Sequence, residues 1–208
     1  RAGAQTGRIE NGLLIDDASI LTSIAAGTQL DAIDIDQTLQ LVFSKFLRNQ
    51  IGAVAGNFAD PKNDPGLVYA QWDEVWCYWD GALRAYSAEG DAAVTVDAEV
   101  EQRIVDGFEW GHSGLESEEA SWQVDPWIVP ASKQIIEKST FATSARLLLA
   151  YAAEAKDAAA DADASAEYAR MAYGQFQIIE DRMKDKNTAG IDVVEGYLTG
   201  DPAMIDVA

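Results

Sequence analysis

The stretch YAQWDEVWCYWDGALRAY, residues 69–86, decides the fold of this chain. Its large apolar residues recur at spacings of three and four, the period of one side of an α-helix. They are Tyr69, Trp72, Trp76, Trp79, Leu83 and Tyr86. Such a stripe is more typical of a buried core than of a ligand-stacking surface, and burying it requires at least two partner helices. The pair Asp64-Pro65 predicts the start of this helix, which we expect to run to about Glu89.

The rest of the chain supplies partner helices. Periodicity predicts helices over residues 36–58, 97–119, 132–156 and 163–186, with shorter helical pieces at 17–27 and 191–198 and one strand-like stretch at 93–96. Gly107, Gly111 and Gly114 weaken the helix prediction over 97–119, so that its second half could break. The chain is therefore predicted to be all-α, a helical bundle with a four-helix-type core and additional short helices. We expect a single domain over 1–208, with an irregular N-terminus at about 1–16 and a frayed C-terminal tail at about 187–208.

Composition limits the classes of partner. The 208 residues include 35 Asp and Glu but only 15 Lys and Arg, which gives a formal net charge of −20. Such a surface repels nucleic acid phosphates and anionic lipid and attracts cations, although acidity also simply favours solubility in a saline medium. No apolar run approaches the roughly 20 residues of a membrane span, so we expect neither nucleic acid binding nor membrane insertion. The polar opening, residues 1–12, looks like an N-terminus from which a signal peptide has been removed.

The only histidine marks the strongest candidate site. His112 lies within the helix predicted at 97–119, with Glu109 three residues before it and Glu116 four residues after it. Positions i−3, i and i+4 lie on one side of a helix, so an imidazole and two carboxylates can converge there on a metal ion. The alternative is a structural histidine paired with a neighbouring carboxylate, beside a solvated acidic helix end.

Further ligands have to come from a neighbouring helix. On the aromatic helix, Asp73, Cys77 and Asp80 form a second line beside the apolar stripe, and Glu74 points further toward solvent. If this helix packs antiparallel against the histidine helix, Asp73 or Asp80 approaches the cluster. One imidazole with several carboxylates suits iron or manganese, whereas an inward Cys77 would favour zinc.

Several enzyme classes lack support in this sequence. With a single histidine, one chain cannot build a three-His zinc site or a pair of Glu-x-x-His helices. There is no Gly-x-Ser-x-Gly elbow, phosphate loop or dinucleotide fingerprint.

Four polar residues interrupt apolar helix faces, namely Gln50, Gln175, Glu137 and Arg146. Where such polar groups are buried, they need hydrogen-bond partners.

Two segments carry a family resemblance. QWDEVWCYW at residues 71–79, followed by Gly81, and AYGQFQII at residues 172–179 resemble motifs of the low-iron-inducible periplasmic proteins of algae and their bacterial relatives. The resemblance covers two helices. It implies a periplasmic or secreted helical protein of iron assimilation without established catalysis, and it makes Asp73, Glu74, Glu109 and His112 candidate ligands.

Taken together, the sequence favours an extracytoplasmic metal-binding protein, with iron as the first choice and manganese or zinc as alternatives, that acts in uptake or sequestration rather than as an enzyme. Its metal ligands would come from His112, Glu109, Glu116, Asp73, Glu74 and Asp80. The alternative is an acidic helical interaction or scaffold domain without a metal site. A carboxylate-bridged di-iron oxidase ranks last, because such sites normally take a Glu-x-x-His motif from each of two helices.

Overall fold

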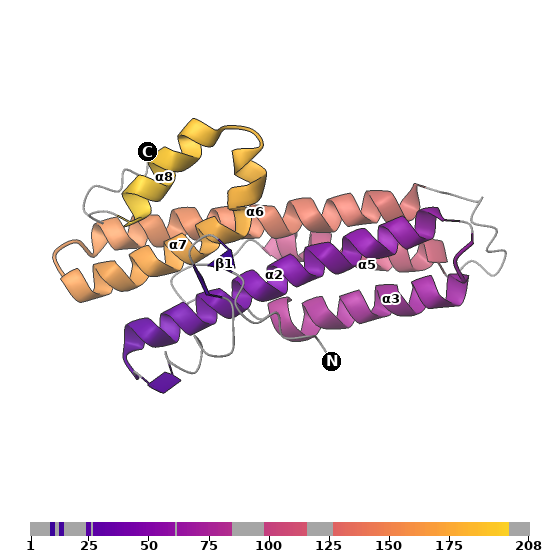
Figure 1. The fold of residues 1–208 in the computed structure, drawn as a ribbon, viewed down its shortest axis with the longest axis horizontal. Helices are drawn as coiled ribbons and strands as arrows, with labels where there is room; N and C mark the ends of the chain where they lie inside the picture. The colour runs from indigo at the N-terminus through magenta and orange to yellow at the C-terminus, as the bar shows by residue number, and fades with distance from the viewer. Residues whose placement is uncertain are drawn as a thin grey trace. The chain divides into compact units, whose positions relative to one another are not determined.

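The computed structural model describes residues 9–10, 13–14, 24–25, 27–60, 62–84, 98–115 and 127–199, and in this part of the chain it confirms the all-α prediction (Figure 1). The α-helices are α2 (Gln29–Ala59), α3 (Pro65–Tyr78), α5 (Ala98–Leu115), α6 (Ile128–Asp157), α7 (Ala162–Lys184) and α8 (Thr188–Thr199). A short antiparallel pair, β1 (Ile9–Glu10) and β2 (Leu13–Leu14), lies in the segment expected to be irregular. None of the described helices is long and apolar enough to cross a membrane.

Several helices end where capping residues and glycine in the sequence predict an end. The side chain of Asp64 accepts a hydrogen bond from the backbone N–H of Gly66 at 2.9 Å, and Pro65 occupies the first turn, as the sequence predicts. Gly27, at the predicted stop, has a φ of 70°, a left-handed conformation that glycine adopts without strain. The helix predicted at 36–58 begins earlier, at Gln29, where Ile33 extends the buried face.

The aromatic helix changes from α-helical to π-helical before it reaches the predicted end at about Glu89. After Tyr78 the chain forms a π-helical turn, η1 (Trp79–Leu83), in which Trp79 and Leu83 are both buried. The remainder of that predicted helix, 85–89, and the predicted strand at 93–96 lie outside the described residues. Single π-turns inside α-helices occur frequently at functional sites.

Tertiary contacts divide the chain into two compact units, one drawn from residues 1–42 and 144–208 and the other from residues 43–143, a division that the sequence analysis did not anticipate. Helices α2 and α6 each contribute residues to both units.

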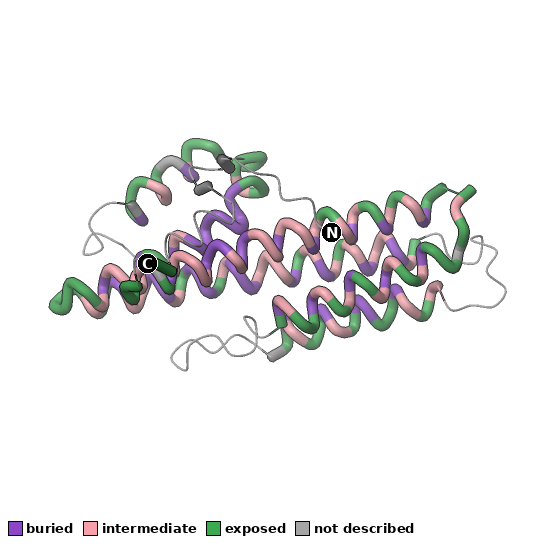
Figure 2. The backbone as a smooth tube through the Cα atoms, turned by 60° about the horizontal axis from the view of Figure 1, so that its bottom comes forward, coloured by how far each residue is buried: buried purple, intermediate pink, exposed green. Residues whose placement is uncertain are grey.

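The unit at 43–143 contains the four-helix-type core that the aromatic stripe predicts. One buried cluster takes residues from the described parts of α2, α3 with η1, α5 and α6, and the buried positions form stripes along these helices (Figure 2). Its members include Leu47, Ile51, Val54, Val68, Trp72, Val75, Trp79, Ile104, Phe108, Val129 and Ile136. Trp72 and Trp79 are each only 1% exposed, which confirms the stripe as core at these positions.

Helix α5 runs unbroken through its glycines to Leu115, so the expected break does not occur within the described residues. The reason is close packing. A Cβ atom at Gly107 would lie 2.9 Å from Cγ1 of Ile136, and one at Gly114 would lie 2.4 Å from Cγ2 of Ile128. These glycines therefore let α6 approach α5, and the packing compensates for their low helix propensity.

In the other unit, a buried polar cluster connects α2 with α7. Gln175 is 1% exposed, and its Nε2 donates hydrogen bonds to Oε1 of Gln37 at 3.1 Å and to Oε1 of Gln40 at 2.6 Å. Gln40 in turn donates to Asp36 at 2.8 Å. The prediction that Gln175 needs polar partners is confirmed.

The other three polar interruptions are not deeply buried. Glu137 forms an ion pair with Lys133 at 3.4 Å, Gln50 is half-buried, and Arg146 is exposed.

Candidate functional site

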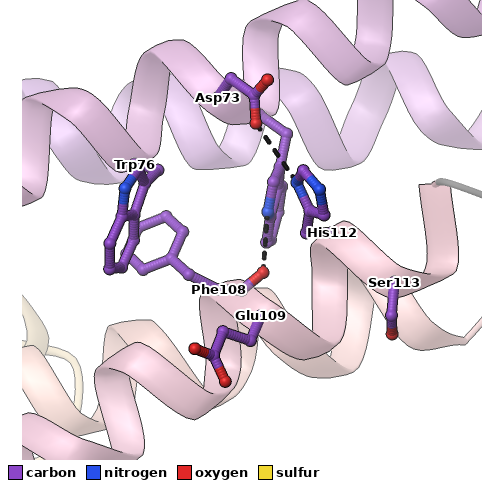
Figure 3. Close-up of a pocket in the computed structure, with 7 residues that line it drawn as sticks. Asp73, Trp76, Phe108, Glu109, His112 and Ser113 are labelled. Atoms are coloured by element: carbon purple, nitrogen blue, oxygen red, sulfur yellow. Dashed lines mark hydrogen bonds and ion pairs between the residues drawn. The ribbon is translucent and has the colours of Figure 1, made fainter.

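A pocket of about 430 Å³ lies between α3 and α5 in the unit at 43–143 (Figure 3). It is lined by Trp72, Asp73 and Trp76 from α3 and by Phe108, Glu109, His112 and Ser113 from α5. Its lining combines three aromatic rings with two carboxylates and the single imidazole of the chain.

The two helices are antiparallel, which is the condition under which Asp73 or Asp80 could approach the histidine. Tyr69 near the start of α3 contacts His112 near the end of α5, whereas Arg84, beyond η1, contacts Glu101 near the start of α5. This direction brings the acidic line of α3 toward the histidine. Which acid of that line reaches the histidine depends on the axial register of the two helices.

The floor of the pocket is aromatic and buried. The indole Nε1 of Trp72 donates a hydrogen bond to the backbone carbonyl of Phe108 at 3.0 Å, and both side chains are almost fully buried. The rings of Trp76 and Phe108 stand 5.2 Å apart at an interplanar angle of 73°. Trp76 is only half-buried, so part of its indole is available to a ligand.

His112 is held at both ring nitrogens by residues of α3. Its Nε2 lies 2.8 Å from the hydroxyl of Tyr69, and its Nδ1 lies 3.3 Å from Oδ1 of Asp73. In the neutral ring that carries its proton on Nδ1, Tyr69 donates to Nε2 and the Nδ1–H faces Asp73. These contacts orient the imidazole at the wall of the pocket.

The structure therefore brings together Asp73 and His112, one of the two pairings that the sequence allows for antiparallel helices. Tyr69 was missed as a partner of the histidine. The signal was present, because Tyr69 precedes Asp73 by one helical turn and so lies on the same side of α3.

The remaining candidate ligands are placed differently. Glu109 lines the pocket and is exposed, and Glu74 is exposed on α3, as expected for a residue that points toward solvent. Glu116 lies outside the described residues.

Asp80 was wrongly expected as a possible neighbour of the histidine. It lies in η1, is exposed, and accepts a hydrogen bond from Nη1 of Arg84 at 2.7 Å, while Nε of Arg84 donates to Glu101 at 2.8 Å. These hydrogen bonds, first to Asp80 and then to Glu101, raise the pKa of the Arg84 guanidinium. Asp80 thus joins an ion-pair network further along the helix pair.

Cys77 does not turn inward. Its side chain is exposed on α3, so the zinc site that required an inward thiolate is not formed. Over the described parts of the chain, no group of three or more His, Cys, Asp or Glu side chains is arranged to hold a metal ion.

Comparisons of the chain with protein-family models, with curated proteins and with solved structures find no match.

Proposed function

We propose that this protein binds a small organic molecule in the pocket between α3 and α5. The observation that carries the proposal is the pocket itself, about 430 Å³ in volume and walled by Trp72, Trp76 and Phe108. Small-molecule sites are typically concave, roughly 300 to 1,000 Å³, and apolar with a few placed polar groups. Here the polar groups are Asp73, Glu109 and His112.

The contacts of His112 support a role in binding rather than in catalysis. Tyr69 and Asp73 contact its two ring nitrogens, at 2.8 Å and 3.3 Å, so the imidazole is positioned as part of the wall. A general base needs a ring nitrogen within hydrogen-bond reach of the substrate. The proposed function is therefore that of a binding protein.

Removal of Trp76 tests this proposal. In ligand-observed NMR on the full chain, with a mixture of neutral, cationic and anionic aromatic fragments, we expect at least one fragment to bind. Trp76→Ala is expected to weaken that binding about five- to tenfold, because an aromatic contact contributes about 1 to 1.5 kcal/mol. Trp110→Ala is the matched control, since Trp110 lies on α5 outside the pocket lining and is 43% exposed. Absence of fragment binding, or equal binding by both variants, would contradict the proposal.

A metal ion is the second candidate ligand. The observation that favours it is that His112, Asp73 and Glu109 line one pocket in an acidic chain. Glu116, four residues beyond His112, is the candidate for a further ligand. Under this alternative, the protein is periplasmic or secreted and takes up or sequesters iron, as the family resemblance implies. One imidazole nitrogen of His112 then exchanges its present partner for the metal.

The metal candidate has its own test. Protein purified without a chelating tag is expected to contain stoichiometric iron, manganese or zinc, and to lose it in the His112→Ala, Glu109→Ala double variant. Because a ligand that binds only the folded state stabilises it, added Fe²⁺ or Zn²⁺ should raise the Tm of the wild type and leave that of the double variant unchanged. Asp106→Ala, an exposed position of α5 outside the pocket lining, is the control. Metal-free protein whose Tm does not respond to either ion would refute this version.

A further inference from the structure

We infer that the ligand of the pocket between α3 and α5 is an organic cation with a methylated ammonium group. The inference rests on the proposed function and specifies its ligand class. It depends on two features that occur together in this pocket, the partly exposed indole of Trp76 and carboxylates contributed by both helices.

The indole of Trp76 suits a diffuse positive charge. It is half-buried, and it packs edge-to-face against Phe108, with the ring planes at 73° and the centroids 5.2 Å apart. Phe108 and Trp72 also line the pocket but are only 2% and 1% exposed, so Trp76 offers most of the aromatic surface. The face of an aromatic ring is negative, most strongly for tryptophan, and attracts a cation, including a quaternary ammonium group, within about 6 Å of the centroid.

Two carboxylates line the same pocket, Asp73 from α3 and Glu109 from α5. Figure 3 shows Asp73 on the upper helix and Glu109 on the lower one, with Trp76 to the left and His112 to the right. The side chain of Asp73 is 48% exposed, and its contact with His112 uses Oδ1, so a carboxylate that accepts at both oxygens can still face a ligand through Oδ2.

The residues that line the pocket include neither Lys nor Arg, so neither of these positively charged side chains repels a bound cation there. The net charge of −20 also raises the concentration of cations near the whole surface. Arg84, the residue that follows η1, forms ion pairs with Asp80 and Glu101.

The same features separate an organic cation from the alternatives. A bare metal ion gains nothing from the indole and phenyl walls, which carry no ligand atoms, and it would leave most of about 430 Å³ unused. A primary ammonium or a guanidinium brings N–H donors that need acceptors, and apolar walls would leave some of them unsatisfied. A methylated ammonium has no N–H donor and spreads its charge over its methyl groups, so it can contact the indole of Trp76 directly.

The test compares choline with 3,3-dimethylbutan-1-ol, which has the same shape without the charge, by isothermal titration calorimetry on the full chain. Choline is expected to bind at least about tenfold more tightly than the neutral analogue. Asp73→Asn should weaken choline about tenfold and leave the analogue unaffected, because the amide keeps an oxygen facing Nδ1 of His112 but removes the charge. Trp76→Leu should also weaken choline, because it removes an aromatic face while keeping an apolar side chain.

Two matched variants separate local from general effects. Asp106→Asn removes the same charge from α5 at an exposed residue that does not line the pocket, and Trp110→Leu removes a tryptophan outside the lining. Both should bind choline as the wild type does. If Asp106→Asn weakens choline as much as Asp73→Asn, the attraction belongs to the whole surface and the assignment to this pocket is wrong.

The outcomes test the ligand class separately from the proposed function. Equal binding of choline and its neutral analogue, both sensitive to Trp76→Leu, would overturn the cation inference and leave a binding pocket for neutral molecules. Failure of both probes to bind also overturns the inference. The proposed function fails with it only if none of the NMR fragments binds in a Trp76-dependent way.

Discussion

Gly111→Ala is expected to lower the free energy of unfolding by about 3 kcal/mol, the upper end of the usual cost of overpacking. A Cβ at this position would lie 2.0 Å from Cζ2 of Trp72, 2.6 Å from Cη2 and 2.7 Å from Cε2. The indole is 1% exposed, and its Nε1 donates to the carbonyl of Phe108 at 3.0 Å. It therefore cannot move away without losing this hydrogen bond or disturbing the core.

Urea denaturation of the variant measures this effect, with Gly56→Ala as the matched control. Gly56 lies in α2, and an added Cβ would meet no heavy atom within 4 Å apart from its chain neighbours and the backbone of its own helix, so alanine should there stabilise the protein by about 0.5 to 1 kcal/mol through helix propensity.

Combining Gly111→Ala with Trp72→Leu tests the cause of the destabilisation. The leucine removes the ring atoms that overlap with the new methyl group, so the alanine should cost less in this background than in the wild type. Equal stability of Gly111→Ala and Gly56→Ala would show that α3 and α5 do not pack as closely as described.

Gln175→Leu should destabilise the unit of residues 1–42 and 144–208 by about 2 to 6 kcal/mol, because it removes a donor from two buried acceptors and each orphaned group costs about 1 to 3 kcal/mol. The acceptors are Oε1 of Gln37 and Oε1 of Gln40, in side chains that are each 8% exposed. Thermal and urea denaturation of the full chain measure the loss.

Two further variants serve as controls, one at an exposed glutamine and one in which the hydrogen-bond partners of Gln175 are also replaced. Gln134→Leu, on the exposed side of α6, should change stability by no more than about 0.5 kcal/mol. Adding Gln37→Leu and Gln40→Leu to Gln175→Leu should recover part of the loss, because the two orphaned amide acceptors are removed, whereas Asp36, which is only half-buried, loses its donors from Gln37 and Gln40 and can be hydrated instead. A single variant as stable as wild type would contradict the buried network.

Sequence reasoning predicted the helices well because their signals are local. The cap at Asp64 and the spacing of the tryptophans depend on neighbours within one or two turns, and so do not require knowledge of the fold. The same spacing predicted that Trp72 and Trp79 are core. The π-turn at Trp79–Leu83 was missed, because its five residues have the same periodicity that an α-helix would show.

For the site, the sequence identified the right helices but could not choose among their acids. Asp73 and Asp80 are two turns apart on one helix and equivalent by periodicity, yet Asp73 contacts His112 whereas Asp80 pairs with Arg84. The choice depends on the axial register of α3 against α5.

What the sequence determined by itself, then, is the helical content and the apolar face of each helix, since both follow from spacing along one chain segment. Only the tertiary structure decided that Tyr69 and Asp73 hold the imidazole, that Gly111 admits Trp72, and that Gln175 finds its acceptors 138 and 135 residues away. The physical reason is that close packing between helices sets their register, and register determines which side chains meet.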